Sequence, residues 1–132
     1  MLPQLPSALA AGLLEDGERA LFLVRKGVLG EDLLEIPCVD VMGGENPVAA
    51  LVEAFRQQAG IDAEVHDILF QRRRNVGTRK RRAFIPVLVF KVTAKSHAVK
   101  PAGGFVGYKW LAPADMGGKK LSRKSEWLRS PV

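Results

Sequence analysis

A strongly basic segment between residues 72 and 82 is the part of the sequence best suited to bind an anion. It carries seven positive charges with no acid between them, on Arg72, Arg73, Arg74, Arg79, Lys80, Arg81 and Arg82. Such a segment suits a diphosphate or nucleotide, the backbone of RNA or DNA, or solvent alone. Because side chains alternate between the two faces of a strand, only some of them can enter one groove. We expect the phosphate contacts to come from Arg72, Arg74, Arg79 and Arg81.

The overall composition also favours a phosphate-bearing partner. Twenty Lys and Arg against fourteen Asp and Glu give a net charge of +6, less than the basic segment alone contributes. Cys38 is the only cysteine, so neither an internal disulfide nor a thiolate metal cluster is expected. No apolar stretch approaches the roughly 20 residues of a membrane span, and the N-terminus lacks the pattern of a secretory signal. We therefore expect a cytoplasmic protein with a single domain over residues 1–132.

The elements that must position the basic segment are predicted to be the two strands of a long hairpin. Residues 63–70 form the strand that leads into the segment, residues 75–78 supply the turn, and residues 83–92 form the return strand. Pro86 interrupts the return strand, which predicts an edge position or a bulge there.

The clearest helix precedes this hairpin. Its apolar positions, Val48, Leu51, Val52, Phe55 and Ala59, follow the spacing of one helical face. Asn46 suits the N-cap, Pro47 the first helical position, and Gly60 the left-handed residue after the end. Both ends of the helix are therefore specified.

The remaining segments complete a mixed sheet. Asp16-Gly17 between two apolar runs predicts a hairpin of residues 8–14 and 20–24, and residues 33–37 and 105–111 read as further strands. Residues 114–116 form a single helical turn and residues 121–129 a basic terminal helix. This order predicts an α/β (α+β) fold in which helices pack on a mixed sheet.

The region from Leu34 to Ile61 resembles the Nudix box. Glu45 matches the first glutamate of that pattern, Phe55 its internal hydrophobic position, and Gly60-Ile61 its terminal pair. The positions that depart from the pattern include those of the charged residues on which Nudix hydrolysis depends. Val39 replaces the first glycine, Glu53 the arginine, Ala54 the next glutamate, and Gln57-Gln58 the glutamate pair.

This resemblance to the MutT-like hydrolases of nucleoside diphosphates implies an α/β/α sandwich and a divalent-metal site. In the family, positions 54, 57 and 58 would share one helix face and hold Mg²⁺ or Mn²⁺ against a diphosphate. Two neutral amides and an alanine make a poor site for either cation. We expect a protein that binds a nucleotide or another phosphate-rich ligand, with weak or no hydrolysis. A surviving metal site would use Glu45, Glu53, Gln57 and Gln58, with Glu53 as the catalytic residue.

Three alternatives remain open at this point. An active pyrophosphohydrolase could recruit Glu45 and Glu53 together with Glu64 or Asp67. A nucleic-acid-binding module could combine the basic hairpin with a basic C-terminal segment, formed by Lys119, Lys120, Arg123, Lys124 and Arg129. A protein-interaction domain or homodimer could hold no ligand at all.

Isolated polar and aromatic residues are expected to have structural roles. His66 and His97 suit surface or strand-end positions, and Cys38 a buried one without catalysis. The aromatic side chains expected in the core are those of Phe22, Phe55, Phe84 and Phe90. On the last strand, Phe105, Tyr108 and Trp110 suit the core better than stacking against a base.

Overall fold

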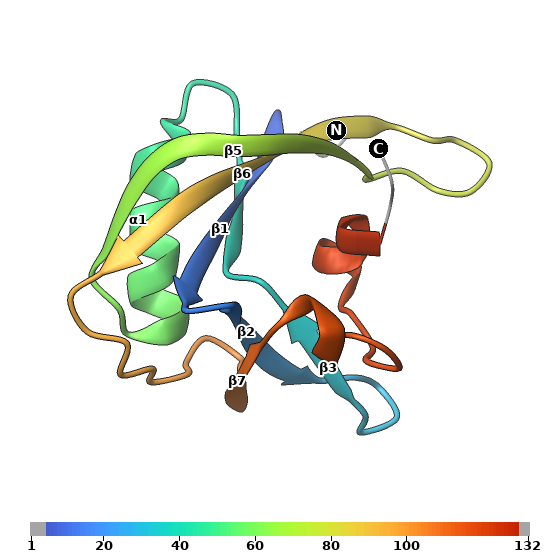
Figure 1. Ribbon diagram of the computed structural model, residues 1–132. Helices are drawn as coiled ribbons and strands as arrows, with labels where there is room; N and C mark the ends of the chain where they lie inside the picture. The colour runs from blue at the N-terminus through green and yellow to red at the C-terminus, as the bar shows by residue number, and fades with distance from the viewer. Residues whose placement is uncertain (1–4, 130–132) are drawn as a thin grey trace.

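A mixed seven-stranded sheet forms the centre of the computed structural model, which describes residues 5–129 (Figure 1). The strands are β1 (Ala8–Asp16), β2 (Arg19–Lys26), β3 (Asp32–Glu35), β4 (Cys38–Val41), β5 (Ala63–Asn75), β6 (Phe84–Ala94) and β7 (Gly107–Leu111). Their order is β3-β2-β1-β6-β5, with β4 paired to β1 and β7 to β2. Only β1 and β6 run parallel, so the sheet is mixed, as predicted.

Helix α1 (Pro47–Ala59) has the boundaries that the sequence specifies. The Asn46 side chain accepts hydrogen bonds from the backbone N–H groups of Val48 and Ala49, and Pro47 occupies the first position. Gly60 adopts a φ of 65° at the other end, a conformation that costs glycine little. The predicted helix and both of its caps are confirmed.

Helices cover both faces of the sheet. On one face, the fully buried Leu51 and Phe55 of α1 pack against β1, where a Cβ on Gly12 would lie 2.5 Å from the Phe55 ring. On the other face lies a second apolar cluster that includes Trp127 of the 3₁₀ helix η2 (Arg123–Arg129). A shorter 3₁₀ turn, η1 (Pro113–Asp115), follows β7. The predicted α/β/α layering is confirmed, although the terminal helix is 3₁₀ and begins at residue 123 rather than 121.

The long hairpin of β5 and β6 extends further than predicted. Arg72, Arg73 and Arg74 lie within β5, and only residues 76–83 form the connecting loop. Pro86 lies one residue before the part of β6 that pairs with β1, so only β5 flanks the strand there. This is the local edge position that the proline predicts. The register irregularities of the hairpin fall between Val65 and Phe70 instead.

Three of the four predicted core phenylalanines are buried. Phe22, Phe55 and Phe90 lie in the two apolar clusters, whereas Phe84 is 49% exposed. The prediction for Phe84 is wrong because the residue lies where the hairpin extends past the body of the sheet, and the Arg73 guanidinium covers its ring at 5.0 Å. Within residues 5–129, no helix has the length and apolar character needed to cross a membrane.

Candidate ligand-binding site

The helix positions that resemble the Nudix metal ligands serve structural roles. The Ala54 side chain is buried in the core beneath α1. Gln58 turns toward the sheet, and its Nε2 donates a hydrogen bond of 2.8 Å to the backbone oxygen of Cys38. Gln57 is exposed, and its Nε2 donates to Oε1 of Glu53 at 3.1 Å.

The two acidic candidates near these positions are also engaged locally. Glu53 is half-exposed and pairs through Oε2 with Nη1 of Arg56 at 2.9 Å. Glu45 accepts a hydrogen bond of 2.7 Å from the backbone N–H of Met42, which closes the turn before α1. Both carboxylates therefore stabilise the segment in which they occur.

These residues do not fit a divalent metal ion. In the part of the chain from residue 5 to residue 129, no three or more His, Cys, Asp or Glu residues come together as a metal site would require. Glu45 and Glu64 lie beyond opposite ends of α1, whose 13 residues span about 20 Å. Metal–oxygen bonds measure only about 2 Å, so one ion cannot bind both carboxylates. This arrangement therefore does not support a metal site in which Glu45, Glu53 and Glu64 replace the usual ligands.

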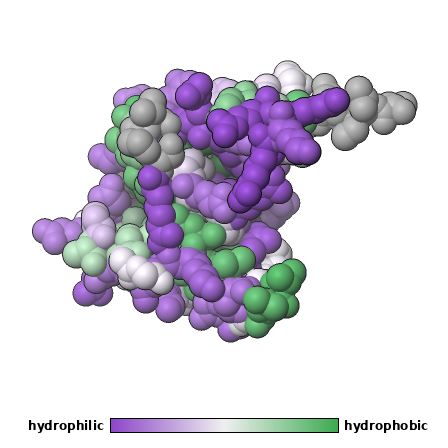
Figure 2. Space-filling view, turned by 90° about the vertical axis from the view of Figure 1, so that its right-hand side faces the viewer, coloured by the Kyte–Doolittle hydropathy of each residue, from purple (hydrophilic) through white to green (hydrophobic). Residues whose placement is uncertain are grey.

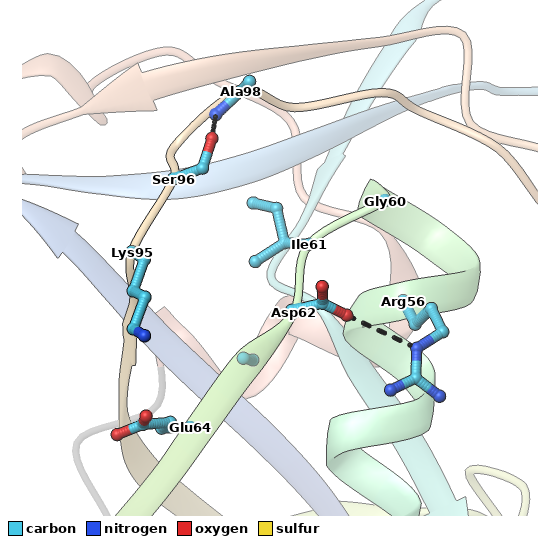
Figure 3. A pocket seen from close by; sticks show the side chains of 9 residues that line it. Arg56, Gly60, Ile61, Asp62, Glu64, Lys95, Ser96 and Ala98 are labelled. Carbon is cyan, nitrogen blue, oxygen red and sulfur yellow. Dashed lines mark hydrogen bonds and ion pairs between the residues drawn. The ribbon is translucent and has the colours of Figure 1, made fainter.

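Glu64 instead borders a cavity at the C-terminal end of α1 (Figure 3). The cavity has a volume of about 430 Å³, and its charged lining residues are Arg56, Asp62, Glu64 and Lys95. Arg56 Nε lies 3.6 Å from Oδ1 of Asp62. Because the acids equal the bases here, the cavity has no electrostatic preference for an anion.

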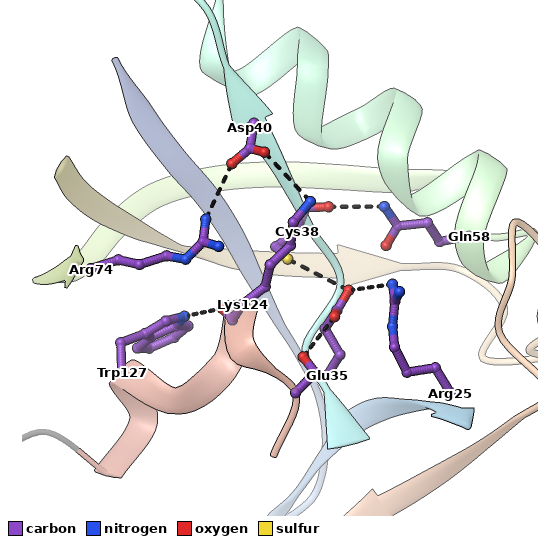
Figure 4. Close-up of polar contacts among 9 residues, drawn as sticks. Arg25, Glu35, Cys38, Asp40, Gln58, Arg74, Lys124 and Trp127 are labelled. Carbon is purple, nitrogen blue, oxygen red and sulfur yellow. Dashed lines mark hydrogen bonds and ion pairs between the residues drawn. The ribbon is translucent and has the colours of Figure 1, made fainter. Parts of the chain in front are cut away.

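A buried polar network lies under the other side of the sheet, centred on Glu35 (Figure 4). Its carboxylate accepts a hydrogen bond of 2.6 Å from Ser122 Oγ and pairs with Nη2 of Arg25 at 3.2 Å. The Cys38 thiol lies 3.9 Å away. Burial, and secondly the charge of Glu35, raises the pKa of Cys38 to about 12, so the thiol stays protonated and unreactive. Cys38 is buried, as predicted.

Asp40 of β4 continues this network toward the basic hairpin. Its two oxygens lie 3.5 Å from Nη1 of Arg74 and 3.5 Å from Nζ of Lys124, so one carboxylate joins β4, β5 and η2 (Figure 4). Arg74 is largely buried, and its Nε has no hydrogen-bond partner among the described residues. A cation with an unpaired donor thus lies at the loop end of the hairpin.

Beside Arg74 is a second cavity, called here the arginine pocket. Its volume is about 360 Å³, and its lining residues are Arg73, Arg74, Asn75, Gly77, Arg79, Arg123, Glu126 and Trp127. Four arginines and one acid, Glu126, are among these lining residues. Trp127 forms an apolar wall, and its indole N–H is already bound to the backbone oxygen of Lys124 at 2.7 Å. The charge of the pocket suits an anion with several oxygens, such as a phosphate.

The structure brings together only part of the predicted phosphate-binding set. Arg74 and Arg79 line the arginine pocket, whereas Arg72 lies over the Phe70 ring at 4.6 Å and Arg81 is exposed on the loop. The sequence analysis did not include Arg73, because alternation along a strand places it on the face opposite Arg72 and Arg74. Arg123 and Trp127 come from η2, and only the basic character of the C-terminal segment pointed to Arg123.

The two histidines have the structural roles that the sequence predicts. His66 is exposed on β5, with Nε2 2.6 Å from Thr93 Oγ1. His97 lies 3.5 Å from a carboxylate oxygen of Asp16 and stacks on Trp110 at a centroid distance of 5.4 Å. Neither histidine lines the arginine pocket.

Comparison with known proteins identifies the fold. The sequence matches no model of a known family and no curated protein. The structure is similar to a MutT protein from Methanosarcina mazei Go1, with a TM-score of 0.66 and 16% identity over 92% of this chain and 88% of that one. It is also similar to a NUDIX-family hydrolase from Clostridium perfringens, with a TM-score of 0.67 and 11% identity over 89% of each chain. An ADP-ribose pyrophosphatase from Streptococcus suis 89-1591 gives a TM-score of 0.66 and 12% identity over 92% and 83%. The chain therefore has the Nudix fold that its sequence predicts.

Proposed function

We propose that this is a Nudix-family protein that binds a nucleotide or another phosphate-bearing small molecule in the arginine pocket, with weak or no metal-dependent hydrolysis. The observation that carries the proposal is the excess of four arginines over one glutamate among the residues that line a cavity of about 360 Å³. Guanidinium groups bind phosphate oxygens through charge-assisted hydrogen bonds, which are the strong ones in proteins. A cavity of this size lies within the usual range for small-molecule sites.

The residues of α1 are the reason for proposing weak or no hydrolysis. A magnesium-dependent hydrolase needs anionic oxygens that hold the ion and offset its charge. Here Ala54 is buried, Gln58 directs its donor to a backbone oxygen, and Glu53 pairs with Arg56. Ala54 has no ligand atom, Gln58 offers only a neutral amide oxygen that is buried, and Glu53 would have to leave Arg56.

Isothermal titration of the protein with ADP-ribose and with a nucleoside triphosphate tests the binding. We expect heat of binding with and without Mg²⁺ or Mn²⁺, and little or no release of product over the same period. Rapid turnover that a chelator abolishes would contradict the proposal, because it would require a metal site that α1 does not provide.

The basic loop itself supplies a matched pair of variants. Arg79 lines the arginine pocket, whereas Arg82 is exposed on the same loop and does not line it. Arg79→Gln should weaken nucleotide binding by about tenfold, as expected for one lost charge-assisted hydrogen bond. Arg82→Gln removes the same charge and should leave the affinity nearly unchanged. Equal losses in the two variants would mean that general electrostatic attraction, rather than the pocket, holds the nucleotide.

A further inference from the structure

The loop between β5 and β6 is a rigid support for cationic side chains. The Val76 N–H donates to the Ala83 oxygen at 2.8 Å, and the Thr78 N–H donates to the Arg81 oxygen at 3.0 Å. The Asn75 side-chain oxygen accepts from the backbone N–H groups of Gly77 and Ala83, at 2.9 and 3.0 Å. These hydrogen bonds fix the backbone of the loop, so the positions from which its side chains extend are fixed as well.

Four consecutive cations of this loop face solvent. Arg79, Lys80, Arg81 and Arg82 are all exposed, and within residues 5–129 none of them pairs with a carboxylate. The tip of the loop projects beyond the sheet (Figure 1). From the side on which it projects, elongated hydrophilic side chains dominate the upper part of the surface (Figure 2). Like charges held this close repel one another unless an anion lies between them.

The arginine pocket does not account for these charges. Of the four loop cations, only Arg79 lines the pocket, and a cavity of about 360 Å³ admits a ligand no larger than about one nucleotide. Lys80, Arg81 and Arg82 are therefore not among the residues that would surround a small ligand in this pocket. An anion that contacts all four must extend along the loop, with negative charges at regular intervals.

The cationic surface also continues beyond the loop. Arg123 of η2 donates a hydrogen bond of 3.3 Å from Nη2 to the backbone oxygen of Gly77, which places its guanidinium group beside the loop. Lys124 and Arg129, in contrast, are engaged with Asp40 and with the Met116 carbonyl oxygen. Arg123 is thus the member of the basic C-terminal segment that is joined directly to the loop.

We infer that the loop of residues 76–83, together with Arg123, binds the phosphodiester backbone of a nucleic-acid strand. Phosphates along such a strand recur at a spacing of a few ångströms, which suits a row of neighbouring cationic side chains. Binding is by contact with the phosphate backbone, since residues 76–83 include no aromatic side chain on which a base could stack. The inference does not depend on the small-ligand proposal, because Lys80, Arg81 and Arg82 lie outside the arginine pocket.

Fluorescence anisotropy with short labelled oligonucleotides tests the inference. The probes are single-stranded RNA, single-stranded DNA and duplex DNA, each titrated over a series of salt concentrations. The test variant combines Lys80→Gln, Arg81→Gln and Arg82→Gln. The control combines Arg19→Gln, Lys91→Gln and Lys95→Gln, which remove the same charge from exposed positions outside the loop. None of the six side chains makes a hydrogen bond or ion pair among the described residues, so both variants should fold, as thermal unfolding would verify.

The expected result is specific to the loop. For at least one probe, the logarithm of the association constant of the wild type should fall steeply with the logarithm of the salt concentration. The loop variant lacks three cations, and each phosphate contact on a single strand contributes about 0.7 to this slope, so its slope should be smaller in magnitude by about two. The loop variant should lose about tenfold or more in affinity at low salt, while the control retains the wild-type slope. An unchanged slope in the loop variant, or an equal loss in the control, would overturn the inference.

Nucleotide titration of the same variants separates this inference from the proposed function. The loop variant should bind a mononucleotide as the wild type does, because Arg73, Arg74, Arg79 and Arg123 remain. Failure of the wild type to bind any mononucleotide would refute the small-ligand proposal and leave the oligonucleotide result standing. Oligonucleotide binding that persists in the loop variant would refute the present inference alone.

Discussion

The side-chain amide of Gln58 donates a hydrogen bond of 2.8 Å to the backbone oxygen of Cys38 and so ties α1 to β4. The other atom of this amide, Oε1, is buried and has no partner among the described residues. A glutamate at this position would present two acceptor oxygens to a backbone acceptor. At this one of the positions that depart from the Nudix box, the packing of the chain therefore favours glutamine over glutamate.

Gln58→Glu should lower the free energy of unfolding by about 1–3 kcal/mol at neutral pH, because a buried donor is replaced by a charge that cannot donate. The loss should shrink on acidification, since a protonated carboxyl group donates again. Urea unfolding at two pH values measures both effects. Gln57→Glu, at an exposed position, serves as the control and should change the stability little.

The opposite outcome has a clear meaning. If Gln58 were a metal ligand, Mg²⁺ would stabilise the wild type, since any ion that binds only the folded state raises its stability. Thermal unfolding of the wild type with and without Mg²⁺ or Mn²⁺ should give equal midpoints. A rise in the midpoint that Gln58→Glu enhances would restore the metal-site hypothesis.

Local signals in the sequence predicted the parts of the fold that depend on nearby residues. The boundaries of α1 follow from Asn46, Pro47 and Gly60. The first hairpin was predicted from Asp16-Gly17, although Asp16 ends β1 and the turn residues are Gly17 and Glu18. β4 was not predicted, because a four-residue strand carries too few alternations to be separated from the loop beside it. Its position depends on pairing with β1, which lies about thirty residues earlier in the chain.

The candidate site was less predictable for the same reason. Arg74 and Arg79 could be named from charge density, but the arginine pocket also needs η2, whose contact with the hairpin is a long-range one. Alternation places Arg73 on the face opposite Arg74, and its guanidinium does lie over the Phe84 ring at 5.0 Å, yet the residue also borders the pocket. Arg81 is placed by the geometry of the loop rather than by strand periodicity.

Asp40→Asn should strengthen phosphate binding while it weakens the fold. The substitution releases Arg74 and Lys124, which both pair with Asp40 at 3.5 Å, and it removes a negative charge beside the arginine pocket. Nucleotide affinity should rise several-fold, and the free energy of unfolding should fall by about 1 kcal/mol, as for partly exposed ion pairs. Calorimetric titration and urea unfolding of one preparation measure the two changes. Asp32→Asn, which removes an exposed pair with Lys26, provides the control and should leave nucleotide affinity unchanged.

Gly77→Ala tests whether the order of the loop matters apart from its charge. A Cβ at Gly77 would lie 2.1 Å from the Arg81 oxygen and 2.9 Å from the Ala83 nitrogen, so the loop cannot keep its hydrogen bonds. Oligonucleotide affinity should fall several-fold with no change in net charge, because the four cations of the loop are no longer held in one fixed arrangement. Hydrogen exchange of the Val76 and Thr78 amides should speed up in parallel.

Gly43→Ala is the matched control, since a Cβ at Gly43 has no neighbour within 4 Å among the described residues. It should leave both the affinity and the exchange rates of the loop unchanged. Wild-type affinity in Gly77→Ala, with fast exchange in the loop, would mean that charge alone holds the nucleic acid.

The buried Cys38 thiol should make the stability of the fold depend on alkaline pH. Burial and the nearby Glu35 carboxylate raise its pKa from the ordinary value of 9.0 to about 12. The unfolded chain therefore loses this proton at a lower pH than the folded one. The contribution of the protonated Cys38 thiol to stability is complete below about pH 9 and is lost as the pH rises toward 12.

Urea unfolding across this pH range should show a steeper decline in the free energy of unfolding for the wild type than for Cys38→Ala. Cys38→Ala should be less stable below pH 9, because it leaves a small cavity, but its curve should be flatter. Parallel curves for the two proteins would show that other groups, such as lysines, account for the whole alkaline loss.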